Sequence, residues 1–126
     1  MTALWPYVII DLLTGTFMLT QTALFAELVY PLLTPYGILL AIHLMAWFRL
    51  GRFMVAYFIP RSKRLLILPW LWLCTVPLHC AGLVLWGQSD LHSLLWHSSH
   101  LVLSFSLWYL AFLKQETAVS KDRMRL

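Results

Sequence analysis

The chain has 126 residues, of which 61% are hydrophobic and 11% charged, and its formal net charge is +4. A soluble domain is usually only about half apolar, so the composition excludes a water-soluble protein and predicts one membrane domain over residues 1–126. The basic residues lie where the orientation of membrane helices requires them, so the positive charge predicts no nucleic-acid partner.

All Lys and Arg residues fall into two short clusters. The first cluster is Arg49, Arg52, Arg61, Lys63 and Arg64, and the second is Lys114, Lys121, Arg123 and Arg125. A basic side chain at the bilayer centre costs at least about 2.5–3.5 kcal/mol, so membrane spans exclude such residues and cytoplasmic loops collect them. We therefore predict that both clusters and both termini lie on the cytoplasmic side of a bacterial or organellar inner membrane.

Four apolar segments follow one another along the chain, each close to the roughly 20 residues that a helix needs to cross the hydrocarbon. They cover residues 6–30, 36–59, 65–87 and 91–113, and a charged cytoplasmic tail, 114–126, follows them. The turns between the segments are short, which favours antiparallel neighbours. The predicted fold is all-α: an integral membrane, antiparallel four-helix bundle with four transmembrane helices and cytoplasmic N and C termini.

The first segment contains two carboxylates. Asp11 lies near its inner end, where the side chain either reaches water or pairs with Arg49 or Arg52. Glu27 lies near its outer end. A proton-coupled transporter would need a carboxylate near the midplane of its first helix, and neither residue is predicted there.

The third segment contains a proline in its interior. Pro77 removes one backbone hydrogen bond, which predicts a kink just before His79. Cys74 and Cys80 lie in the same segment, separated by about 600° of helical rotation. They point to different faces, so we expect no disulfide between them and interpret both as small buried side chains.

The histidines are all predicted in the outer half of the bundle. At 1.5 Å per residue, His43 lies about 10 Å and His79 about 12 Å below the outer ends of their segments. His97 and His100 are three residues apart and share one face of the fourth segment, while His92 lies at the outer rim. Three different segments therefore supply imidazoles at one depth.

This layer predicts a cofactor site, because imidazole is the commonest metal ligand and histidines on facing helices often bind haem iron. The candidate ligands of a b-type haem are His43, His79, His97 and His100. The candidate ligands of copper or zinc are His97, His100, His79 and Glu27. The alternative is that no cofactor is bound and that each histidine only makes a hydrogen bond within the bundle.

Two stretches carry a resemblance to a known family. Ala41-Ile42-His43-Leu44-Met45-Ala46-Trp47 and Leu95-Trp96-His97-Ser98-Ser99-His100-Leu101 are the stretches concerned. The first resembles the start of a helix, and the second the start of the final helix, in small copper-resistance-D-like membrane proteins and the related bacterial membrane protoporphyrinogen oxidase. The resemblance implies a haem or copper site that uses His43 and a residue near His97 or His100.

Three functions follow from these features. The first is a small multi-pass membrane protein that binds b-type haem or a transition metal for electron transfer or metal handling. The second is a non-catalytic accessory or assembly subunit of a larger membrane complex, and the third is a small transporter or immunity-type protein. The expected partners are the lipid bilayer and other membrane subunits or further copies of the chain. Enzymatic activity is left open, because no nucleophile–base motif, phosphate-binding glycine loop or dinucleotide fingerprint is present.

Overall fold

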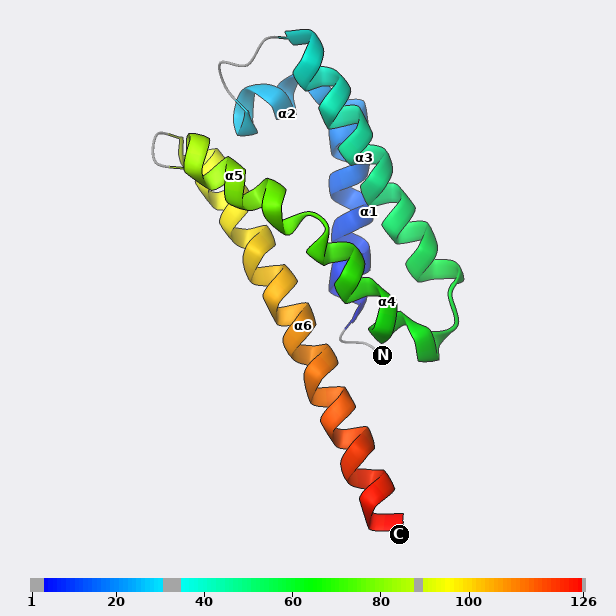
Figure 1. The fold of residues 1–126 in the computed structure, drawn as a ribbon. Coiled ribbons are helices and arrows are strands. Elements are labelled where there is room, and N and C mark those ends of the chain that lie inside the picture. The colour runs from blue at the N-terminus through cyan, green and yellow to red at the C-terminus, as the bar shows by residue number, and fades with distance from the viewer. Residues whose placement is uncertain (1–3, 31–34, 88–89, 126) are drawn as a thin grey trace.

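The computed structural model describes residues 4–30, 35–87 and 90–125, and in these ranges it consists of helices and short connections without a strand (Figure 1). The helices are α1 (Trp5–Thr20), α2 (Thr22–Val29), α3 (Pro35–Phe58), α4 (Arg61–Leu73), α5 (Val76–Trp86) and α6 (Leu91–Arg125). The all-α prediction is confirmed. The turns expected around residues 31–34 and 88–89 lie outside the described residues.

Two of the described helical segments are long and apolar enough to cross a membrane. One is Leu39–Phe58 in α3, and the other is Ser62–Trp86, which joins α4 and α5. The bent pair α1 and α2 provides a third crossing if the pair is one span. Membrane-spanning helices are thus supported, while four crossings, their antiparallel order and the side of the termini stay predictions.

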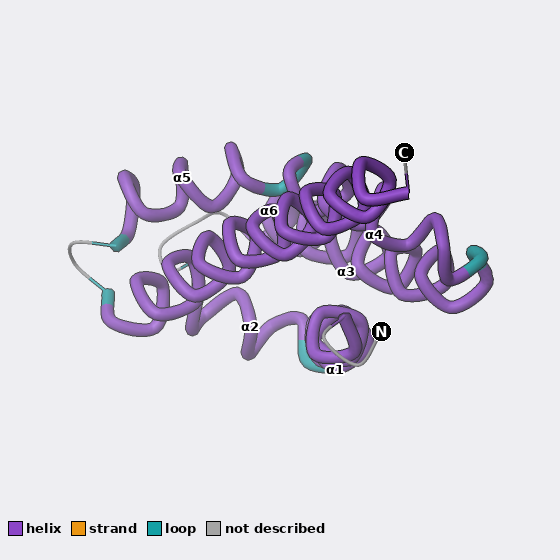
Figure 2. Tube along the Cα trace, turned by 90° about the horizontal axis from the view of Figure 1, so that it is seen from below, coloured by secondary structure: helices purple, strands orange, loops and turns teal. Residues whose placement is uncertain are grey.

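The sequence pattern predicts one continuous helix for the first apolar segment, and this prediction is wrong. α1 and α2 are bent by 105° at Gln21, whose φ of −122° and ψ of 49° lie outside the helical region. Figure 2 shows α1 nearly end on, with α2 running away from it. The bend buries Phe25 of α2, whose ring lies 4.9 Å from that of Trp96 on α6. Tertiary packing, and no proline or glycine, accounts for the interruption.

The third apolar segment is interrupted, but at residues 74–75 and not just before His79, where Pro77 predicts a kink. Cys74 and Thr75 form the turn between α4 and α5, and Pro77 lies in the first turn of α5, where its missing N–H removes no helical hydrogen bond. Cys74 and Cys80 are free and exposed. Their predicted burial is wrong, because the buried face of this segment belongs to larger side chains such as Trp72.

Two apolar clusters hold the helices together, and α1 and α3 contribute to both. One surrounds Trp72 and Leu107, and the other surrounds Phe25 and Ile42. Between the clusters α1 closely approaches α3 at Gly15, where a Cβ atom would lie 3.0 Å from the Leu50 side chain. The polar residues of α1 and α3 that matter most for function lie along this same contact.

The last helix begins with a polar cap and continues beyond the other helices. The backbone N–H of Ser93 donates to the Asp90 carboxylate at 2.9 Å, and this hydrogen bond lowers the pKa of Asp90 below its ordinary value. The Ser93 hydroxyl also donates to the Val29 carbonyl at the end of α2. Past Leu113 the helix runs on as an extension with exposed Lys114, as Figure 1 shows, so the predicted tail is helical.

Candidate functional site

Two arginines and one aspartate are buried where α1 packs on α3. Asp11, Arg49 and Arg52 are 1%, 4% and 2% exposed. The Arg52 Nη2 atom lies 2.6 Å from Asp11 Oδ1, so the two side chains form an ion pair. Of the two alternatives that the sequence leaves open for Asp11, the structure shows the pairing with an arginine and not the contact with water. Arg49 and Arg52 are also not solvated residues of a basic loop, because their spacing of three residues places both on the face of α3 that meets α1. The side of the membrane on which they lie stays a prediction.

Arg49 connects the ion pair to the histidines of α6. Its Nη1 atom donates to Thr14 Oγ1 at 2.9 Å and lies 3.0 Å from His100 Nε2. His100 Nδ1 lies 2.8 Å from the Trp96 carbonyl oxygen, which can only accept a hydrogen bond, so Nδ1 carries the proton. Nε2 therefore accepts from Arg49. His100 is neutral in this arrangement, and the lone pair on its Nε2 atom already accepts the hydrogen bond from Arg49.

Two further histidines meet beside His100. His79 on α5 and His97 on α6 are 1% and 0% exposed, and their Nδ1 atoms lie 3.1 Å apart. One ring donates and the other accepts, so one Nδ1 is deprotonated. His79 also stacks on His100, with ring centroids 4.8 Å apart. We call Asp11, Arg49, Arg52, His79, His97 and His100 together the buried charged centre.

Gly82 on α5 makes room for His97. A Cβ atom at position 82 would lie 2.2 Å from His97 Nε2, so only glycine admits the ring where it is. The ring therefore packs directly on the backbone of α5. The contact between His79 and His97 depends on this close approach of the two helices.

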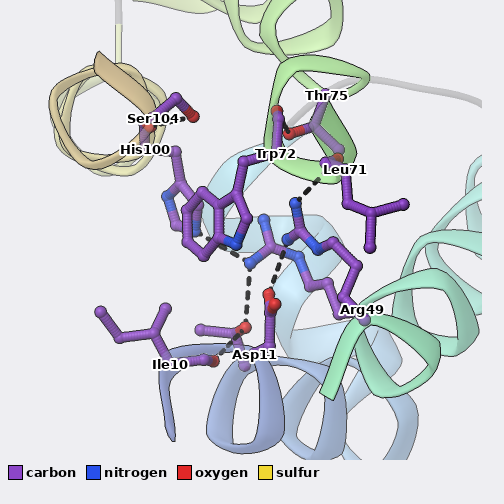
Figure 3. Close-up of polar contacts among 10 residues, drawn as sticks. Ile10, Asp11, Arg49, Leu71, Trp72, Thr75, His100 and Ser104 are labelled. Carbon is purple, nitrogen blue, oxygen red and sulfur yellow. Dashed lines mark hydrogen bonds and ion pairs between the residues drawn. The ribbon is translucent and has the colours of Figure 1, made fainter. Parts of the chain in front are cut away.

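Indole rings cover the two guanidinium groups. Arg52 Cζ lies 4.4 Å from the ring centroid of Trp72, and Arg49 Cζ lies 5.1 Å from that of Trp96. The Trp72 ring also stacks on His100. Figure 3 shows Asp11, Arg49, Trp72 and His100 converging from α1, α3, α4 and α6. Cation–π contacts of this kind stabilise a cation where little water reaches it.

The structure brings together three of the predicted ligands and leaves two apart. His79, His97 and His100 lie in the buried charged centre. His43 is half-buried, with its Nδ1 atom 2.8 Å from the Leu39 carbonyl oxygen, and Glu27 is exposed on α2. Within the described ranges, no hydrogen bond, ion pair or ring contact joins His43 or Glu27 to the three buried histidines.

The imidazole nitrogens of the centre do not surround a common point. His79 and His97 face each other through Nδ1, His97 Nε2 packs on Gly82, and His100 Nε2 accepts from Arg49. In the part of the chain that the structure describes, no three His, Cys, Asp or Glu side chains are grouped so that they could hold a metal ion. Haem or metal binding would require these rings to turn, and it stays a prediction.

The centre has more hydrogen-bond donors than acceptors. Among the described residues, the buried side-chain atoms without a hydrogen-bond partner include Arg52 Nε, Trp72 Nε1, His79 Nε2 and His97 Nε2. The first two can only donate. With both rings neutral, the His79–His97 pair has one protonated and one bare Nε2 atom. Three donors and one acceptor are therefore unsatisfied, so these residues present a surplus of buried donors.

Comparison with known proteins provides no relative: no family model matches the chain, and no curated protein and no solved structure is significantly similar to it. The resemblance to copper-resistance-D-like proteins therefore stays a prediction. The function has to be inferred from the geometry of the buried charged centre.

We predict that Gly82→Ala displaces His97 and lowers the free energy of unfolding by about 1–3 kcal/mol, the usual cost of overpacking. Gly51→Ala is the matched control, because the structure leaves the space beside Gly51 open. Thermal or denaturant unfolding of the purified protein measures both. In a His97→Ala background the added methyl group meets no ring, so Gly82→Ala should cost much less there. An equal cost in both backgrounds would contradict the contact.

Proposed function

We propose that this protein is a multi-pass inner-membrane carrier that binds an anionic, oxygen-bearing ligand at the buried charged centre. The observation that carries the proposal is the burial of two guanidinium groups, those of Arg49 and Arg52, beside one buried carboxylate, Asp11, which forms an ion pair with Arg52 alone. In this proposal α1 with α2, α3, α4 with α5, and α6 make four crossings, and both termini are cytoplasmic.

The charge balance of the centre supports an anionic ligand. Arginine is not deprotonated in proteins, so Arg49 and Arg52 contribute two positive charges and Asp11 contributes one negative charge. One positive charge is left even when all three imidazoles are neutral. A buried, uncompensated ion costs several kcal/mol. An anion bound beside the guanidinium groups offsets that cost, whereas Asp11 alone does not.

The unsatisfied donors support an oxygen-bearing group. A carboxylate or phosphate has several lone pairs and matches the forked geometry of a guanidinium group. Arg52 Nε and Trp72 Nε1 are buried donors in need of such an acceptor. Ionisable residues inside a membrane commonly mark the pathway of a substrate or an ion.

The interrupted helices support a carrier. Many transporters bind their substrate where membrane-spanning helices are broken. Here α1 and α2 are bent at Gln21, and α4 and α5 are separated by Cys74 and Thr75. Both interrupted segments contribute to the centre, through Asp11 on α1, Trp72 on α4 and His79 on α5.

We predict that acetate or inorganic phosphate stabilises the purified protein against heat, in proportion to the logarithm of the anion concentration once the site is occupied. Arg49→Gln should weaken binding about tenfold or more, since a hydrogen bond to a charged group contributes about 1.5–3 kcal/mol. Arg49→Lys keeps the charge and should retain part of the effect. The measurement is the melting temperature at constant ionic strength, with sodium chloride as the reference salt.

Lys63→Gln is the matched control, because it removes one positive charge from an exposed site. Its response to each anion should equal that of the unmodified protein. The proposal is wrong if the unmodified protein, Arg49→Gln and Lys63→Gln respond alike to acetate, phosphate and chloride.

A second candidate is the binding of b-type haem or of copper or zinc. The observation that favours it is the pair of buried imidazole atoms without a partner, His79 Nε2 and His97 Nε2. Neutral imidazole nitrogens of this kind are the usual ligands of such groups. To hold such a group, both rings would have to turn away from their Nδ1 contact.

For this candidate we predict a Soret absorption band, or copper or zinc in stoichiometric amount, in the purified protein. His79→Ala and His97→Ala should each abolish the signal, and His43→Ala tests the ligand that the family resemblance implies. His92→Ala, an exposed histidine, is the control. Full occupancy in the His79 and His97 variants would end the ligand assignment. Failure of both anion and metal binding, together with co-purifying subunits, would favour the accessory role.

A further inference from the structure

An apolar groove runs beside the buried charged centre. It lies between the bent pair α1–α2 and α6, and it has a volume of about 310 Å³. Phe17, Phe25 and Leu28 line one side, and Leu95 and Trp96 line the other. The bend at Gln21 creates this groove, because it turns α2 away from α1 and toward α6.

One side chain, Trp96, separates the groove from the centre. Its indole lines the groove and also contacts Arg49, whose Cζ atom lies 5.1 Å from the ring centroid. The same indole lies 4.3 Å from the His100 ring, measured between centroids. Trp96 is half-buried, and its indole lies between the groove and the guanidinium group of Arg49.

From this adjacency we propose that the ligand is an anionic amphiphile, whose hydrocarbon tail lies in the groove and whose carboxylate or phosphate headgroup reaches Arg49 when the Trp96 side chain turns aside. The inference rests on the proposed function and names the substrate class of the same site. The arginines supply the charge complementary to the headgroup. His92 and Ser99 also line the groove, but most of its surface comes from aromatic and aliphatic side chains, which attract a hydrocarbon chain.

Chain length is the property that separates an amphiphile from a simple anion. Each methylene group that leaves water for an apolar site should lower Kd roughly fourfold. The affinity for acetate, butanoate, hexanoate and octanoate should therefore rise in steps until the groove is full. A parallel series of alkyl phosphates compared with inorganic phosphate tests which headgroup the arginines prefer.

The decisive variant fills the groove and leaves the arginines intact. Leu95→Trp places a large side chain in the groove, and Leu94→Trp is the matched control, since Leu94 is an exposed neighbour on α6 that does not line the groove. Binding is measured for each probe by competition or calorimetry in one detergent. The partition of a probe into micelles is the same for every variant, so it cancels when the affinities of the variants are compared at one chain length.

The expected result is a steep gain of affinity with chain length in the unmodified protein and in Leu94→Trp, and a flat series in Leu95→Trp with acetate binding retained. If affinity depends on chain length equally in all three proteins and acetate is still bound, the proposed binding of a hydrocarbon tail in the groove is wrong and the anion site remains supported. Loss of binding of every probe, acetate and inorganic phosphate included, would overturn the proposed function itself.

Discussion

The ion pair between Asp11 and Arg52 is the interaction on which the rest of this structure depends. A lone charge in an apolar interior is unstable by several kcal/mol, whereas a hydrogen-bonded pair is tolerated. The pair therefore fixes α1 against α3 in one register. That register also places Thr14 within 2.9 Å of Arg49 and allows the close contact at Gly15. A shift of one helix along the other would break all of these contacts at once.

The same register decides what the histidines can do. Arg49 donates to His100 and so fixes its tautomer, and His100 in turn stacks on His79. A histidine that accepts a hydrogen bond from an arginine is a poor metal ligand, because the lone pair is already used. The excess positive charge and the surplus of donors instead suit an anion. The two candidate functions use different atoms of the same region, because an anion would accept from guanidinium and indole N–H groups while a metal would bind His79 Nε2 and His97 Nε2. This makes them separable by experiment.

Part of this site follows from the sequence and part does not. Helical spacing alone predicts that His97 and His100 share a face, and the bounds of α3 lie within one residue of the predicted segment. The burial of Arg49 and Arg52 does not follow, because a rule based on charge treats every basic residue near a span end as solvated. Two features of the sequence together indicate their burial. Arg49 and Arg52 are three residues apart on one helix face, and a carboxylate, Asp11, lies inside another apolar segment. The bend at Gln21 has no proline or glycine to mark it, although Thr20 and Thr22 on either side bond back to carbonyls of the preceding turn, which can bend a helix.

A double-mutant cycle on Asp11 and Arg52 tests the central claim most directly. The free energy of unfolding is measured for the unmodified protein, Asp11→Asn, Arg52→Met and the double variant. Removal of one partner leaves the other buried and uncompensated, so Arg52→Met alone should cost about 3–5 kcal/mol, and the double variant should cost well under the sum of the two single variants. Strictly additive effects would show that the two side chains do not interact, and would contradict the account of the buried charged centre given above.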